Sequence, residues 1–204
     1  MIVYVETNFV LELAYLRPTS DNCKRLLALA GEGTISLVVP AFALIEARLA
    51  WQSNVKRRNR LHSEVSTELR ELSRSRPHTD IASQSYAFVS ALIDTAEQDR
   101  RRLESAVHAI LGQAIVLPTE PSIVRQAHLT ELLYDLSPQD SIIYTTVIEH
   151  ARGDEGPKLF VTQNAKDFRV PQIEEELTKH ACKLLFAFDS AERYVRSEID
   201  GRPS

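Results

Sequence analysis

The sequence predicts an α/β protein, a three-layer sandwich with a parallel five-stranded sheet and an inserted helical hairpin. Short apolar runs alternate with helical periods, which is the pattern of a parallel sheet whose strands are connected by helices. One long stretch breaks this rhythm, because it carries two helical patterns and no strand signal. The 204 residues, of which 44% are hydrophobic and 25% charged, suit one globular domain over residues 1–204.

Five short runs of apolar or β-branched residues are the predicted strands. The run at 34–39 combines β-branched and apolar residues, whereas the run at 115–117 has only three residues. Helical sequence follows each run, so that helices can cover both faces of the sheet. In chain order the predicted strands are 2–5, 34–39, 115–117, 158–161 and 184–188.

Capping residues and prolines predict where the helices begin and end. A helix at about 9–16 stops before Pro18, because proline disfavours helix in the residue that precedes it. The sharpest start is Ser137, an N-cap before Pro138, with Asp140 closing a capping box. Further helices are predicted from Ser20 or Asp21 to Gly31, from Pro40 onward, and over 121–134.

Residues 52–112 predict an antiparallel helical hairpin inserted within this domain, divided near Pro77. Each predicted helix has an apolar stripe at helical spacing, which indicates core packing or the seam of a homodimer. The stripes consist of Leu61, Val65, Leu69 and Leu72, and of Val89, Leu92, Ala96, Leu103, Val107 and Ile110.

Composition and missing motifs exclude several classes of protein. A net charge of −4 argues against a polycation that coats nucleic acid, but leaves room for a local basic patch. The sequence has no GxSxG elbow, no P-loop, no Gly-rich dinucleotide turn and no paired zinc spacing. Cys23 and Cys182 are expected to be buried reduced thiols. Without a secretory signal or a membrane-length apolar run, the expected location is cytoplasmic.

Acidic side chains are predicted to gather at one edge of the sheet. Glu6 directly follows the first strand, Glu46 lies two turns into the helix after the second, and Asp167 follows the fourth. Asp140 lies in the first turn of the helix that leads into the fourth strand. Loops at the carboxyl ends of parallel strands form the ligand site in open sheets, so these four can converge. Their polar neighbours are Thr7, Asn8, Thr162 and Asn164.

Four segments, at residues 3–9, 45–46, 140–144 and 162–168, resemble the signature blocks of PIN-domain nucleases in order and setting. The resemblance implies strand order 3-2-1-4-5 and an acidic pocket that binds Mg²⁺ or Mn²⁺. It also implies cleavage of single-stranded or structured RNA. Many members are toxins of bacterial toxin–antitoxin pairs, so an antitoxin-like protein is an expected partner. The chain departs from the family in having Glu6 where Asp is usual, and in its hairpin.

The resemblance implies that Glu6, Glu46 and Asp140 are metal ligands, with Asp167 a fourth ligand or an outer carboxylate. Thr7, Asn8, Thr162 and Asn164 would orient waters, carboxylates or the scissile phosphate. Most of these residues also have a structural alternative. Glu6 could interact with a helix dipole, Glu46 could be a surface residue and Asp140 a capping residue. Asp167, Asn8 and Thr162 could be turn or capping residues, and Glu12 is expected to face solvent.

The predicted function is therefore a metal-dependent endoribonuclease with a two-metal-type mechanism. The alternative is a catalytically weak or inactive PIN-like module that binds RNA or protein. Basic residues in the hairpin could guide the RNA backbone toward the acidic pocket, or could form a solvated face paired with nearby glutamates. The candidates for RNA binding are Lys56, Arg57, Arg58 and Arg60.

Overall fold

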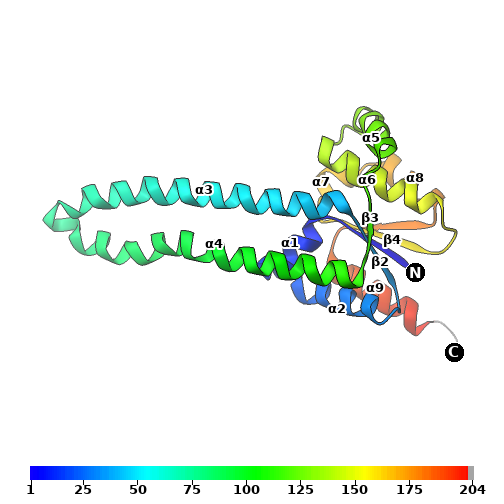
Figure 1. The fold of residues 1–204 in the computed structure, drawn as a ribbon, viewed down its shortest axis with the longest axis horizontal. Helices are drawn as coiled ribbons and strands as arrows, with labels where there is room; N and C mark the ends of the chain where they lie inside the picture. Colours follow the sequence, from blue (N-terminus) through cyan, green and yellow to red (C-terminus); the bar gives the residue numbers. More distant parts are fainter. Residues whose placement is uncertain (202–204) are drawn as a thin grey trace.

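A computed structural model, which describes residues 1–201, contains one parallel sheet in the order β3-β2-β1-β4-β5 (Figure 1). Both the predicted fold class and the predicted strand order are confirmed. The central strands β1 and β4 are almost wholly buried, as expected when helices cover both faces of a parallel sheet. The strands are β1 (Ile2–Val5), β2 (Ser36–Pro40), β3 (Ile115–Leu117), β4 (Lys158–Val161) and β5 (Cys182–Leu185).

Helices form the two outer layers of the sandwich. Helices α2 and α9 lie on one side of the sheet, and α5, α6 and α8 lie on the other (Figure 1). The bounds are α1 (Thr7–Tyr15), α2 (Ser20–Gly31), α5 (Pro121–Tyr134), α6 (Pro138–Arg152), α7 (Ala165–Phe168), α8 (Pro171–Lys179) and α9 (Phe188–Asp200). The chain crosses from β3 to β4 past β2 and β1, so the strand order reverses beside β1. Ligands bind at such a switch point in open α/β sheets.

The fifth strand begins earlier than its sequence predicts. The expected run was 184–188, but β5 spans Cys182–Leu185, and Phe188 is the first residue of α9. Ala181 adopts a left-handed backbone (φ 52°), which turns the chain so that Cys182 pairs with Lys158. Phe188 is buried through its edge-to-face contact with Phe9, at 5.5 Å between ring centroids. A short apolar run can form either a buried strand or the buried first turn of a helix, and its hydrophobic pattern does not distinguish the two.

The hairpin consists of α3 (Ala41–Ser73) and α4 (Thr79–Gln113), joined at the tip by the short 3₁₀ helix η1 (Arg76–His78). The two helices run side by side and extend beyond the sheet layers (Figure 1). Helix α3 begins directly after β2, so one continuous helix carries both Glu46 and the first arm of the hairpin. The two predicted apolar stripes are only partly buried between the helices. Leu69 and Val89 are buried in a small cluster near the tip, whereas Leu61 and Leu72 are 44% and 42% exposed.

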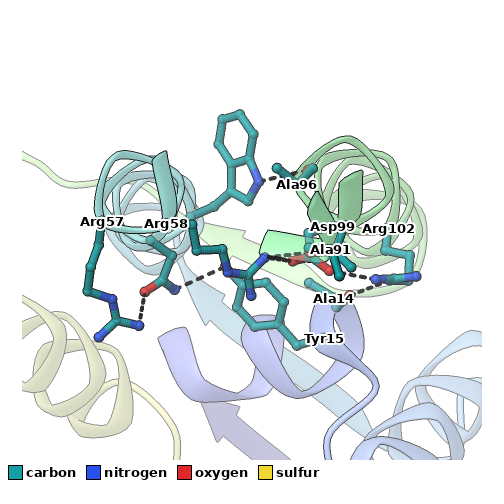
Figure 2. Close-up of polar contacts among 11 residues, drawn as sticks. Ala14, Tyr15, Arg57, Arg58, Ala91, Ala96, Asp99 and Arg102 are labelled. Atoms are coloured by element: carbon teal, nitrogen blue, oxygen red, sulfur yellow. Dashed lines mark hydrogen bonds and ion pairs between the residues drawn. The ribbon is translucent and has the colours of Figure 1, made fainter. Parts of the chain in front are cut away.

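A cluster of ion pairs around the buried Asp99 links the hairpin to α1 (Figure 2). Asp99 of α4 is only 5% exposed and accepts from Arg58 of α3 at 2.7 Å and from Arg102 at 2.5 Å. Arg102 also donates through Nε to the backbone oxygen of Ala14 at 3.1 Å, near the last turn of α1. Cations favour helix carboxyl ends. The cluster therefore links the helix that carries Glu46 to the helix that begins beside Glu6.

Two further expectations from the sequence can be compared with the structure. Cys23 and Cys182 are buried free thiols, as predicted, and burial raises the pKa of both above the ordinary range. None of the helices within residues 1–201 combines the length and the apolar character needed to cross a membrane.

Candidate active site at the carboxyl edge of the sheet

An open pocket of about 510 Å³ lies at the carboxyl ends of β1 and β4, beside the switch point of the sheet. It brings together six of the residues predicted for the site, and they come from four separate segments of the chain. Three of them are carboxylates, and none of the Lys or Arg residues within 1–201 lines the pocket. The pocket is lined by Glu6, Thr7, Asn8, Leu11, Glu46, Ala50, Asp140, Gln163 and Asn164.

Glu6 combines a site position with a structural role. It is the N-cap of α1, because its Oε2 accepts from the backbone N–H of Asn8 at 2.8 Å. Its Oε1 accepts from the backbone N–H of Gln163 at 3.4 Å, which ties the end of β1 to the loop after β4. This cap explains why α1 begins at Thr7 rather than at about residue 9 as predicted. The structural alternative for Glu6, an interaction with the start of a helix, is therefore observed, and its role as a metal ligand stays a prediction.

Glu46 points into the pocket from the second turn of α3. Its Oε2 accepts a hydrogen bond from the hydroxyl of Thr7, the residue that follows Glu6 in the chain and also lines the pocket. Glu46 is thus held by a neighbouring site residue and is not merely a solvated residue on the helix surface.

Asp140 is anchored at the start of α6. Ser137 is the N-cap, as predicted, and its Oγ accepts from the backbone N–H of Asp140 at 3.1 Å. The Ser137 hydroxyl donates to Asp140 Oδ2 at 2.6 Å, and Asn164 Nδ2 lies 3.2 Å from each carboxylate oxygen. These bonds fix the carboxylate toward the loop after β4. The predicted capping box is formed only in part, because the Asp140 carboxylate accepts from the Ser137 hydroxyl rather than from the Ser137 backbone N–H.

The other two predicted residues lie outside the pocket lining. Thr162 is fully buried, and its hydroxyl oxygen accepts from the backbone N–H of Asn164 at 2.9 Å. It therefore shapes the loop that carries Asn164. Asp167 lies on α7, close enough for its charge to act on Asp140 but not among the lining residues.

One expectation about this region is wrong. Glu12 does not face solvent, since it is buried and accepts from the backbone N–H of Thr19 at 3.0 Å and from its hydroxyl at 2.6 Å. The bend between α1 and α2 turns Thr19 back onto α1. Helical periodicity alone does not predict this contact.

Sequence reasoning missed the role of Gln163. Its backbone N–H donates to Glu6 and its side chain lines the pocket, while Nε2 lies 3.3 Å from the Thr19 hydroxyl. The available signal was its position between Thr162 and Asn164, directly after a buried strand. Leu11 and Ala50 supply apolar walls, and their helical spacing from Thr7 and Glu46 would have identified them.

The carboxyl groups of the pocket repel one another in a poorly solvated setting. Burial raises the pKa of Glu6 to about 7, although hydrogen bonds from Asn8 and Gln163 oppose the shift, and the charge of Glu46 adds to it. Burial and the charge of Asp140 raise the pKa of Glu46, against the Thr7 hydrogen bond. Burial and the charge of Asp167 raise the pKa of Asp140, against the bonds from Ser137 and Asn164. The pocket therefore favours a positively charged occupant.

Replacing Glu6 with Gln is expected to stabilise the protein in EDTA at pH 8 by about 1–3 kcal/mol. The raised pKa means that the folded state holds a proton more tightly than the unfolded state, so stability falls as pH rises through about 7. Below about pH 4.5 both states are protonated, and the advantage of the variant disappears. Urea unfolding of both proteins at pH 4, 6 and 8 measures this difference in the free energy of unfolding. Equal stabilisation at every pH would contradict a titrating Glu6.

The pocket's donor set fits a divalent cation chemically. Carboxylate, amide and hydroxyl oxygens are the ligands that Mg²⁺ and Mn²⁺ prefer. Within residues 1–201, no three His, Cys, Asp or Glu side chains lie close enough together to hold an ion. Glu46 and Asp140 instead point their oxygens at Thr7 and Asn164. For the carboxylates to converge on one ion these side chains would have to move closer together, and each carboxylate keeps lone pairs for a metal beside those hydrogen bonds.

The basic candidates all lie on α3 but differ in surroundings. Arg58 points toward α4 and pairs with Asp99, whereas Arg57 and Lys56 are exposed. Arg60 is exposed and pairs with Glu64 at 2.7 Å. The expected alternative, pairing between neighbours on the helix, thus describes Arg60.

A sequence profile described as "PIN domain" matches residues 3–168, which is most of the chain and includes all four carboxylates of the predicted site. The chain belongs to the PIN-domain family. The resemblance inferred from the four segments is thereby confirmed, and the protein belongs to a nuclease-type family. A comparison with curated proteins finds no significant match to this PIN domain.

This PIN domain is also similar to a solved structure, the crystal structure of VapBC2 from Rickettsia felis bound to a DNA fragment from their promoter. The match has 15% sequence identity and a TM-score of 0.45. It covers 91% of this chain and 98% of the other.

Proposed function

We propose that this PIN domain is a divalent-metal-dependent endoribonuclease. The observation that carries the proposal is the pocket itself, which Glu6, Glu46 and Asp140 line together with no Lys or Arg of residues 1–201 among the lining residues. Burial and mutual repulsion raise the pKa of each of these three carboxyl groups. These carboxylates repel an anionic phosphodiester, and a bound cation would offset their charge.

Glu6, Glu46 and Asp140 would hold the metal, Mg²⁺ or Mn²⁺, with Asp167 of α7 as a fourth ligand or an outer carboxylate. When bound, the metal supplies positive charge at the scissile phosphate and a water of lowered pKa. Thr7 and Asn164 orient Glu46 and Asp140, as their hydrogen bonds indicate. Asn8 lines the pocket beside Glu6, where its side-chain amide would donate to a phosphate oxygen. Thr162 holds the Asn164 loop in place.

Metal dependence is tested with labelled single-stranded RNA and the native protein in Mn²⁺, Mg²⁺ or EDTA. We expect cleavage only with metal. We also expect Mn²⁺ to raise the melting temperature, because a ligand that binds only the folded state stabilises it by about 2.7 kcal/mol at 100 times its dissociation constant. Cleavage that continues in EDTA, or Mn²⁺ at millimolar concentration without a thermal shift, would contradict the proposal.

The second candidate is a binding module without catalysis. It is favoured by Glu6, whose carboxylate already serves as the cap of α1 and is one methylene longer than the usual Asp. This candidate predicts RNA binding in EDTA without cleavage in any metal. An antitoxin-like partner, a homodimer and a cytoplasmic location stay predictions from the sequence.

A further inference from the structure

One face of α3 runs continuously from the acidic pocket into the hairpin. Residues three or four positions apart share a helix face, and Glu46 and Ala50 both line the pocket. The same spacing continues through Ser53 to Arg57 and Arg60, and all three are exposed. Basic side chains therefore begin where the pocket lining ends, on the face of the helix that carries a proposed metal ligand.

Arg57 and Arg58 are adjacent in sequence but face different surroundings. Figure 2 shows Arg57 on the side of α3 away from α4, whereas Arg58 points toward α4 and Asp99. The only side-chain hydrogen bond of Arg57 within the described chain is to Asn54 Oδ1 at 3.2 Å, and no carboxylate in residues 1–201 forms an ion pair with it. Its guanidinium keeps donors free for an anion.

The separation between pocket and arginine sets a length for the ligand. At about 1.5 Å per residue, Arg57 lies about 16 Å along α3 from Glu46. A stacked strand rises about 3.4 Å per nucleotide, so this separation corresponds to about five nucleotides, and to fewer in an extended strand. A phosphate of the same strand can therefore reach Arg57 while another lies in the pocket.

We propose that Arg57, supported by Arg60, binds the backbone of single-stranded RNA a few nucleotides from the cleaved bond, and so makes the enzyme prefer long substrates. This inference rests on the proposed nuclease function and adds a residue that selects substrate length. Arg58 has no part in it, because Asp99 holds it against the hairpin seam. The contact is to phosphate, so it positions the strand without reading its sequence.

Binding in EDTA tests the inference without cleavage. The native protein, Arg57→Gln and Arg70→Gln are compared on a fluorescent RNA of about 12 nucleotides over a range of salt concentrations. Arg70 is the matched control, since it is exposed on α3 but lies farther along and off the pocket face. We expect Arg57→Gln to weaken binding about threefold to fivefold at low salt and to reduce the salt slope by about 0.7. An equal loss in both variants would overturn the inference.

Cleavage of long and short RNA separates this inference from the proposed function. With Mn²⁺, Arg57→Gln is expected to raise KM for the long RNA and leave kcat unchanged, because Arg57 does not touch the reacting phosphate. An RNA with about two nucleotides on each side of the cleaved bond does not reach Arg57, so both proteins should cut it equally. Native cleavage that Arg57→Gln matches on both lengths overturns the inference alone. Native protein that cuts neither RNA overturns the proposed function as well.

Discussion

Asp140→Asn is expected to lower metal-dependent RNA cleavage by about 100-fold or more while the fold persists. The substitution removes a negative charge from the pocket but keeps the shape of the side chain. An amide oxygen in the place of Oδ2 can still accept from Ser137 and Asn164, and the backbone N–H of residue 140 still donates to Ser137, so the start of α6 is preserved. Because burial and Asp167 raise the pKa of Asp140, losing its charge should leave the melting temperature in EDTA unchanged or slightly higher.

The matched control is Glu149→Gln, which removes a carboxylate from the same helix. Glu149 is exposed, pairs with Arg152 and does not line the acidic pocket, so cleavage should stay within about twofold of the native rate. Single-turnover cleavage with Mn²⁺ measures both variants, and the Mn²⁺-induced thermal shift should shrink only in Asp140→Asn. Native-level cleavage by a pure preparation of Asp140→Asn would show that Asp140 is not a catalytic residue.

Asp99→Ala is expected to destabilise the protein by about 2–4 kcal/mol, which for a chain of this length lowers the melting temperature by roughly 5–15 °C. The substitution leaves Arg58 and Arg102 without their shared carboxylate inside the hairpin. The expected loss is somewhat below that for a fully buried pair, because both arginines are partly exposed. Urea denaturation followed by circular dichroism measures the change.

Glu64→Ala provides the comparison for Asp99→Ala within the same hairpin. It breaks the Arg60–Glu64 pair, whose side chains are 83% and 58% exposed, and should cost no more than about 0.5 kcal/mol. If the two variants lost equal stability, the cluster at Asp99 would have no special part in fastening the hairpin to α1.

The fold was largely predictable because its signals are local. The apolar runs gave β1 through β4 at nearly their observed positions, and Ser137 with Pro138 gave the start of α6. The fifth strand was misplaced because a buried apolar run of a few residues does not distinguish a strand from the first turn of a helix. The left-handed turn at Ala181, which starts β5 early, has no glycine to announce it.

The candidate site was predictable to the level of residue type and strand end. Glu6, Glu46, Asp140 and Asn164 line one pocket at the carboxyl edge of the sheet. The sequence did not show that Asp167 lies outside the pocket lining while its charge still acts on Asp140, or that Glu12 turns inward to Thr19. Both depend on how short connecting segments bend.

The sequence by itself determined the α/β class, the hairpin and the gathering of acids at one edge, because side-chain periodicity and strand ends are properties of each segment. Only the tertiary structure decided which neighbour each side chain meets. Arg57 and Arg58 differ by one position, yet Arg57 donates to Asn54 and forms no ion pair within residues 1–201, whereas Arg58 pairs with Asp99. Periodicity fixes a residue's direction relative to its own helix axis, whereas packing determines what lies in that direction.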